Sequence, residues 1–354
     1  VFKRLRDEDP LHYCKAGWNS IARRSGDEAV GPYWSVTRYE DIMAIDTDHH
    51  RFSSEPFITL QNPAEDFPLP MFIAMDQPKH DIQRQTVAPV VASPSLSRMS
   101  ELIRERTQTV INQIPLNEEF DWVNTVSVEL TTMMLATLFD FPFEDRRKLT
   151  RWSDVATASP ETGIVESETQ RRAELMECVE YFMNLWQQRI GKEGHDLITL
   201  LANGENTRDM EPMEYLGNLI LLIVGGNDTT RNSMSGSVYG SHLFPSEWEK
   251  VRASRDLIPN AVSEIIRWQT PLAYMRRTAL EDVDMHGKTI KAGDKVAMWY
   301  ASGNRDERKF DDPDTLLFDR KNARNHISFG SGIRRCYGTR LAEMRLRVLW
   351  AEML

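Results

Sequence analysis

Helical spacing of apolar residues is the main pattern in this chain, and it is clearest over residues 168–190. Further helices are predicted over residues 40–45, 96–114, 123–139, 144–156 and 197–202. Strands are fewer: one is predicted over residues 33–36, and residues 283–298 are expected to form hairpin strands that turn at Gly287 and again at residues 292–294. Because helices dominate, with small sheets between them, the sequence predicts a mainly α fold.

The longest predicted helix, residues 211–244, is apolar nearly all round and then becomes polar. A helix that is apolar on every side lies at the centre of a protein, and this apolar run is far too short to span a membrane. Gly225 and Gly226 interrupt it, although each glycine costs a helix roughly 1 kcal/mol relative to alanine. Thr229 follows Gly225 by four residues, so its hydroxyl can compete for the Gly225 carbonyl and loosen the helix. A close helix crossing beside a capping Asp-Thr pair is the structural alternative.

A glycine- and arginine-containing segment, residues 329–338, holds a cysteine just before a predicted helix. The helix dipole and the nearby arginines favour the thiolate form of Cys336. Glycines around the sulfur leave room for a large flat ligand, and haem iron with a cysteine axial ligand fits that description. A buried core cysteine beside a turn is the alternative that Cys336 alone would allow.

The same segment resembles the haem-binding signature of the cytochrome P-450 monooxygenases. Phe329, Gly332, Arg334, Cys336 and Gly338 match that signature position by position. The resemblance implies a haem b cofactor with Cys336 as the axial iron ligand, Phe329 packed against the sulfur and Arg334 at a haem propionate. Gly332 and Gly338 are expected to let the backbone approach the sulfur and the ring without a side-chain clash.

The interrupted central helix resembles the distal oxygen-activation motif of the same family. By that resemblance Gly225 and Gly226 would line an open metal face that holds O₂ and water, and Asp228 and Thr229 would relay protons to the distal oxygen. Thr230 is placed with these two as a catalytic residue. The fold implied is the cytochrome P-450 fold, with haem between this helix and the cysteine loop.

Glu264 and Arg267 are three residues apart, so they lie on the same side of one predicted helix. Such pairs are mostly solvated and contribute little to stability. Bulky apolar neighbours, Ile265, Ile266 and Trp268, indicate instead a packed setting in which further polar partners are needed. The pair resembles the family's Glu-x-x-Arg element, which implies a role in folding and haem retention, with Arg320 as its third member.

Haem carries two carboxylates, so a binding site needs cations along one edge. His80 and Arg84 are four residues apart on a helix that begins just after a proline, so they point the same way. They resemble the family's propionate-binding pair, and Arg277 and His326 match further propionate positions. Arg276 competes with Arg277 for its role, and a surface or structural cation is the alternative at each position.

Composition limits the possible classes of protein. No linker or repeat divides the 354 residues, so a single domain over 1–354 is expected. A net charge of −10 argues against a nucleic-acid partner. Three cysteines cannot form a disulfide framework, and no signal peptide or membrane anchor is visible, which leads us to expect a cytoplasmic protein. Compared with the family, the chain is expected to be truncated at both ends and to lack the C-terminal strands that help to wall the pocket.

The residues expected to face substrate are apolar: Leu222, Leu272 and Met275. They indicate a lipophilic substrate. Residues 221–239 and 266–282 resemble the soluble bacterial branch of the family that hydroxylates alkanes and fatty acids at the chain end, so terminal hydroxylation is the function we expect. The alternatives are hydroxylation of a terpenoid or a sterol side chain, a non-catalytic haem-thiolate sensor, and a cysteine hydrolase without haem.

No dinucleotide- or flavin-binding fingerprint appears, so electrons from NAD(P)H must come through separate proteins. A ferredoxin with its reductase is the partner that the resemblance implies. A basic docking face near the cysteine is expected from five arginines: Arg334, Arg335, Arg340, Arg345 and Arg347. The alternative is that Arg334 serves a propionate and the others form a solvated helix face.

Overall fold

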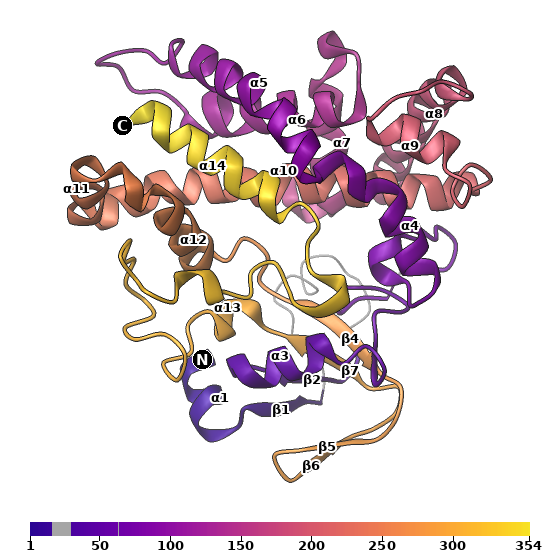
Figure 1. Ribbon diagram of the computed structural model, residues 1–354. Coiled ribbons are helices and arrows are strands. Elements are labelled where there is room, and N and C mark those ends of the chain that lie inside the picture. Colours follow the sequence, from indigo (N-terminus) through magenta and orange to yellow (C-terminus); the bar gives the residue numbers. More distant parts are fainter. Residues whose placement is uncertain (16–29, 63) are drawn as a thin grey trace.

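The structure is a computed structural model that describes residues 1–15, 30–62 and 64–354 (Figure 1). Its helices are α1 (Phe2–Glu8), α3 (Tyr39–Thr47), α4 (Lys79–Val87), α5 (Ser93–Ile111), α6 (Glu129–Phe139), α7 (Arg147–Thr157), α8 (Glu168–Arg189), α9 (Leu197–Asn203), α10 (Pro212–Leu243), α11 (Pro245–Ala253), α12 (Ile258–Gln269), α13 (Tyr300–Gly303) and α14 (Thr339–Met353). Its strands are β1 (Leu11–Cys14), β2 (Tyr33–Val36), β3 (Phe52–Ser53), β4 (Met275–Ala279), β5 (Val283–Met285), β6 (Lys288–Ile290) and β7 (Lys295–Met298).

The predicted mainly α fold is confirmed, and each predicted helix is present within a few residues of its expected ends. The stretch predicted as one helix over residues 123–139 begins with a π-helical turn, Val123–Val128, before α6. The apolar pattern predicts neither the strand β4 nor the helix α11, although the structure contains both. Among the described residues, no helix is both long and apolar enough to cross a bilayer.

The prediction of consecutive hairpin strands over residues 283–298 is correct only for the first pair. β5 and β6 pair antiparallel, and Gly287 in their turn has a φ of +71°. β7 instead enters a five-stranded sheet of order β1-β2-β7-β4-β3, parallel to β2 and antiparallel to β4. Val296, Ala297 and Met298 are all completely buried. A two-stranded ribbon cannot cover both faces of a strand, whereas a central position in a larger sheet can.

The long helix α10 passes through the middle of the helical part of the molecule, with the five-stranded sheet at the opposite end from α5 and α6 (Figure 1). It packs against α6, α7, α8, α12 and α14. Its buried residues include Leu216, Leu219 and Ile223, each fully inaccessible to solvent. This confirms the prediction of a central buried helix.

The segment that leads into α4 is fixed against α10. A Cβ at Gly217 would lie 2.0 Å from the Pro70 carbonyl oxygen, so only glycine allows the two backbones to approach here. One residue further on, the Asn218 side chain accepts a hydrogen bond of 2.8 Å from the Phe72 backbone N–H. These contacts place α4, with His80 and Arg84, at a defined position beside the central helix.

Candidate functional site

The cysteine lies in a loop closed by backbone hydrogen bonds. The Cys336 N–H donates to the Phe329 carbonyl at 2.8 Å, and the Gly330 N–H donates to the Ile327 carbonyl at 2.9 Å. On the other side, the Thr339 hydroxyl at the start of α14 donates to the Cys336 carbonyl at 2.8 Å. The cysteine is therefore held between a tight loop and the first turn of a helix, as the sequence motif predicts.

Cys336 is accessible to solvent, yet burial raises the pKa of its thiol. A side chain that is both accessible and desolvated lies in a recess and not on the outer surface. The Gly338 backbone N–H, Arg84 and Thr339 act to lower that pKa, but burial outweighs them. The helix start and the arginines thus act in the expected direction, towards the thiolate, while burial of the sulfur favours the protonated thiol. A bound metal ion would have to displace the proton.

The two glycines of the cysteine motif, Gly332 and Gly338, differ in how closely the surrounding protein atoms approach them. Gly332 has a φ of +66°, and a Cβ there would lie 3.1 Å from the Thr47 Cα, so it allows the loop to approach the end of α3. At Gly338 a Cβ would lie 3.7 Å from the Cys336 sulfur, which is ordinary van der Waals contact. The protein atoms alone thus require glycine at position 332 but not at position 338.

Asp46, at the end of α3, connects the cysteine loop to the sheet, and no sequence motif predicts this role. Its carboxylate accepts hydrogen bonds from the Ser331 N–H at 2.7 Å and from the Tyr300 hydroxyl at 3.2 Å. It also pairs with the Arg277 guanidinium at 2.6 Å, and both side chains are buried. One carboxylate therefore connects α3, β4 and the loop that carries Cys336.

Four of the predicted propionate-binding groups lie near one another. Burial is the main cause that lowers the pKa of His80, and the positive charges of Arg334 and Arg84 lower it further. Burial also lowers the pKa of Arg334, and the nearby charge of Arg277 is the second cause. The acidic groups that face Arg334 are Asp76, Asp46 and Asp81.

Several donors in this cation cluster are buried without an acceptor among the described residues. They are Nε of Arg277, and Nε and Nη1 of Arg334. Buried donors left unpaired cost free energy, and a ligand with two carboxylates would satisfy them. The cluster therefore fits the propionate edge of a haem, and the single thiol of Cys336 fits its axial ligand.

Not all of the residues expected at the propionates are cations in the structure. Burial lowers the pKa of His80, and it lowers the pKa of His326 to about 3, so both imidazoles are neutral at pH 7. Arg84 donates to the Arg335 carbonyl at 2.5 Å and lies over the Tyr337 ring. The charge is thus carried by arginines, while the histidines can only donate or accept hydrogen bonds.

The choice between Arg276 and Arg277 is decided by the alternation of side chains along β4. Arg276 donates to the Asn62 side chain at 2.8 Å and to the Thr59 carbonyl at 3.3 Å. Arg277 is on the opposite face of the strand, with Asp46. Only Arg277 belongs to the cation cluster.

Glu264, Arg267 and Arg320 are brought together as predicted. Arg267 forms two hydrogen bonds of 2.7 Å with Glu264, and neither side chain is exposed. Arg320 donates to the same carboxylate at 2.9 Å. The further partners that a buried pair requires are backbone groups, because Arg267 also donates to the carbonyls of Asn304 at 2.7 Å and Pro313 at 2.8 Å.

The central helix carries the predicted threonine contact. The Thr229 hydroxyl donates to the Gly225 carbonyl at 2.9 Å. The helix is not loosened by it, however, because α10 is α-helical without interruption from Pro212 to Leu243. A Cβ at Gly225 would meet no atom within 4 Å, whereas one at Gly226 would lie 2.7 Å from a Leu135 methyl group. Gly225 therefore borders open space, while Gly226 allows close packing against α6.

Asp228 points towards α7. Its carboxylate accepts from Arg231 at 2.8 Å and from the Ser153 hydroxyl at 3.1 Å, and Arg231 also bonds Asp154 at 3.2 Å. Burial raises the pKa of Asp228, and the charge of Arg231 opposes that effect. The carboxylate thus lies in a network between two helices, one residue from Thr229. Thr230 is buried.

The predicted substrate contacts need one correction. Leu222 is 5% exposed and belongs to the main hydrophobic core. Leu221 and Val224 are only partly buried and share the side of α10 that carries Gly225 and Thr229. The helical spacing from Gly225 would have identified Leu221, since residues four apart lie on one face. Leu272 and Met275 are partly buried and pack beside the sheet.

The predicted basic docking face contains fewer arginines than expected. Arg334 and Arg345 are buried, at 6% and 4% exposure. Arg347 pairs with Glu343 at 2.7 Å. Only Arg335 and Arg340 are exposed, and Arg340 donates to the Ser93 hydroxyl at 2.8 Å.

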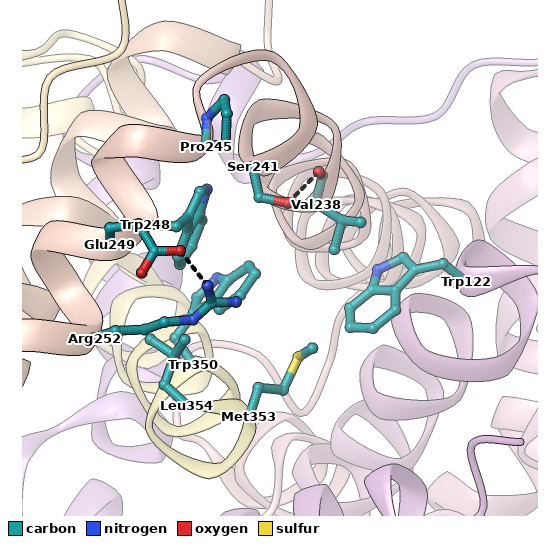
Figure 2. A pocket seen from close by; sticks show the side chains of 10 residues that line it. All are labelled: Trp122, Val238, Ser241, Pro245, Trp248, Glu249, Arg252, Trp350, Met353 and Leu354. Atoms are coloured by element: carbon teal, nitrogen blue, oxygen red, sulfur yellow. Dashed lines mark hydrogen bonds and ion pairs between the residues drawn. The ribbon is translucent and has the colours of Figure 1, made fainter. Parts of the chain in front are cut away.

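A separate hollow of about 240 Å³ lies between the end of α10, α11 and the end of α14 (Figure 2). Trp122, Trp248 and Trp350 line it, and Glu249 and Arg252 pair at its rim. No residue of the cysteine motif, the distal motif or the cation cluster contributes to it. It is distinct from the recess at Cys336.

Comparison with known proteins agrees with this geometry. The profile of the cytochrome P-450 family matches residues 246–354. Linalool 8-monooxygenase of Pseudomonas putida is 34% identical over 362 residues, covering 99% of this chain and 86% of that protein. The methyl-branched lipid omega-hydroxylase of Mycobacterium tuberculosis is 29% identical over 361 residues, covering 100% of this chain and 83% of that protein. Among solved structures, CYP153D17 from Sphingomonas sp. PAMC 26605 is similar with a TM-score of 0.90 and 50% identity, covering 99% of this chain and 86% of that one.

Replacing Arg267 with methionine should lower the free energy of unfolding by about 3–5 kcal/mol, because Glu264 would then stay buried with half of its partners missing. Urea unfolding of the purified protein measures this loss, and haem content after purification should fall with it. Arg252→Met is the matched control: Arg252 pairs with Glu249 but is 59% exposed, so its loss should cost less than about 1 kcal/mol. Equal stability of the two variants would contradict a stabilising role for the buried Glu264–Arg267 pair.

Replacing Thr229 with alanine should leave haem and substrate binding intact but lower the product formed per electron pair consumed, with hydrogen peroxide appearing in its place. The reason is the hydroxyl on the Gly225 carbonyl, at the open side of α10. NADH consumption, product and peroxide are measured together. Thr109→Ala is the control, because the Thr109 hydroxyl makes the same kind of bond, to the Glu105 carbonyl at 2.9 Å, at an exposed position on α5. An unchanged ratio of product to electrons in Thr229→Ala would exclude a role in proton delivery.

Proposed function

Because the chain belongs to the cytochrome P-450 family of haem-thiolate monooxygenases, we propose that it inserts one oxygen atom of O₂ into the terminal C–H bond of a medium-chain alkane or fatty acid. The observation that carries the proposal is the apolar side of α10, where Leu221 and Val224 lie beside Gly225 and Thr229. Such a surface favours a lipophilic substrate close to the distal motif. A relative named methyl-branched lipid omega-hydroxylase supports attack at a chain end.

Haem b, when bound, supplies the activation of O₂ at an iron atom held by Cys336. Arg334 and Arg277 present unpaired donors to its carboxylates, which fixes the cofactor's orientation relative to the cysteine loop. Arg84 adds positive charge beside the cysteine sulfur and so favours the ligated thiolate. These groups bind and orient the cofactor and take no part in proton transfer.

Proton delivery is proposed for α10. The Asp228 carboxylate, whose pKa is raised by burial, is the acid nearest in sequence to Thr229, and Ser153 and Arg231 hold it. The Thr229 hydroxyl, on the Gly225 carbonyl, provides the last donor on the open side of the helix. The apolar residues one turn before them exclude bulk water, which keeps protons from arriving by other routes.

Regioselectivity would come from the walls of the substrate channel. Internal C–H bonds react more readily than terminal ones, so only confinement of the chain tip can favour the end. Leu272, between α12 and β4, and Met275, the first residue of β4, are partly buried and available to narrow the channel. A difference of about 1.4 kcal/mol between competing transition states changes a product ratio tenfold.

A terpenoid substrate is the second candidate. The observation that favours it is the 34% identity to a linalool 8-monooxygenase over almost the whole chain. A branched, compact terpenoid and a linear chain demand different channel shapes, so binding titrations with both classes separate the two candidates.

Electrons are proposed to come from NAD(P)H through a ferredoxin and its reductase. The exposed arginines beside the cysteine loop, Arg335 and Arg340, provide a small positive area on an otherwise acidic chain for an acidic redox protein.

A product analysis on n-alkanes and fatty acids of graded length, with a surrogate redox pair, tests the proposed function. The parent enzyme should give mainly the terminal alcohol, and Leu272→Ala should shift product towards subterminal positions by up to about tenfold. Leu280→Ala is the matched control, since Leu280 is 54% exposed and follows β4. Mainly internal alcohols from the parent enzyme would contradict terminal hydroxylation and leave the monooxygenase family assignment unchanged.

A further inference from the structure

Arg345 is a buried arginine that connects the helix after the cysteine to the central helix. It lies on α14 and is 4% exposed. Its Nη1 atom donates to the Gly226 carbonyl of α10 at 3.3 Å, and its Nη2 atom donates to the Leu130 carbonyl of α6 at 3.2 Å. In Figure 1, α14 crosses α10 close to the middle of the molecule, and the two helices are in contact. One guanidinium therefore joins three helices.

Among the described residues, no carboxylate pairs with the buried Arg345. Burial alone lowers its pKa, to about 9, with no contribution from a neighbouring charge, so it remains a cation at neutral pH. By contrast, the buried Arg267 and Arg277 each pair with a carboxylate. A buried cation held only by carbonyl groups is costly, and an apolar residue of similar length would pack there without that cost. A buried, unpaired arginine is expected only where the position of the groups that it binds matters more than the stability of the protein.

The carbonyl that Arg345 contacts belongs to the distal turn of α10. Gly226 follows Gly225, whose carbonyl accepts the Thr229 hydroxyl at 2.9 Å. In an α-helix the Gly226 carbonyl also accepts the amide of Thr230. At its other end, α14 begins three residues after Cys336. Resting on the proposed monooxygenase function, we propose that Arg345 is a positioning residue that fixes the Gly225–Thr229 turn relative to the helix that follows the iron ligand.

Hydrogen exchange provides a test that does not depend on turnover. In Arg345→Met, which keeps the length and removes the donors, the backbone amides of residues 226–230 should exchange faster than in the parent protein by about tenfold, the effect of losing one hydrogen bond to a charged group. Amides of α8 should be unaffected. Arg347→Met, the same substitution two residues further along α14 at an arginine paired with Glu343, should leave the exchange of residues 226–230 unchanged.

The second readout is coupling on whichever substrate the parent enzyme oxidises. Arg345→Met should retain the haem but lose product per NADH severalfold, and the loss should not add to that of Thr229→Ala in the double variant, because both act through one turn. Arg345→Lys, which keeps the charge and one donor, should restore part of it. If Arg345→Met does not retain haem, Arg345→Lys decides, and full coupling in that variant contradicts the proposal. Unchanged exchange at residues 226–230, or additive losses, would also overturn it. If the parent enzyme oxidises no alkane, fatty acid or terpenoid, the proposed function fails, while the exchange result still decides the role of Arg345.

Discussion

The buried ion pair between Glu264 and Arg267 is the interaction on which the cysteine site depends. Removing two charges from water costs several kcal/mol per ion, and this cost is offset only when every remaining donor and acceptor is satisfied. Here the guanidinium binds the carbonyls of Asn304 and Pro313 in addition to the carboxylate, and Arg320 completes the cluster. The chain from residue 304 to residue 335 has little regular structure. The cluster gives this irregular stretch one defined path towards Cys336.

Two other polar contacts complete the site from different directions. Asp46 holds the cysteine loop to α3 and the sheet through Ser331, Tyr300 and Arg277. Around it, buried nitrogen atoms of Arg277 and Arg334 lack acceptors within the described chain. Buried donors without acceptors destabilise this region until a ligand with carboxylate groups accepts their hydrogen bonds. Cofactor binding and the stability of this region are therefore coupled. Haem retention and the folding of the cysteine loop are therefore expected to change together.

Local patterns could be predicted from the sequence, and long-range pairings could not. The helices, the Glu264–Arg267 contact and the Thr229 hydrogen bond all follow from spacings of three or four residues, which the sequence displays directly. The local pattern predicts a hairpin of β6 and β7, because nothing local reveals that β2, more than 250 residues earlier, is the partner of β7. The neutral state of His326 and the inward position of Arg345 also depend on burial by distant segments. The predicted substrate contact, Leu222, lies in the core, and its neighbour Leu221 is on the side of α10 that carries Gly225. An unbroken apolar run does not show which side of a helix is the open one.

The central claim is that Cys336 is the thiolate ligand of a haem. The most direct measurement is the absorption spectrum of the purified, haem-loaded protein, reduced and saturated with carbon monoxide. The account predicts a strongly red-shifted Soret band, because ligation of the iron by the Cys336 thiolate would produce that shift, and predicts that Cys336→Ala loses this band. A Cys336→Ala variant that keeps the red-shifted band would contradict the account.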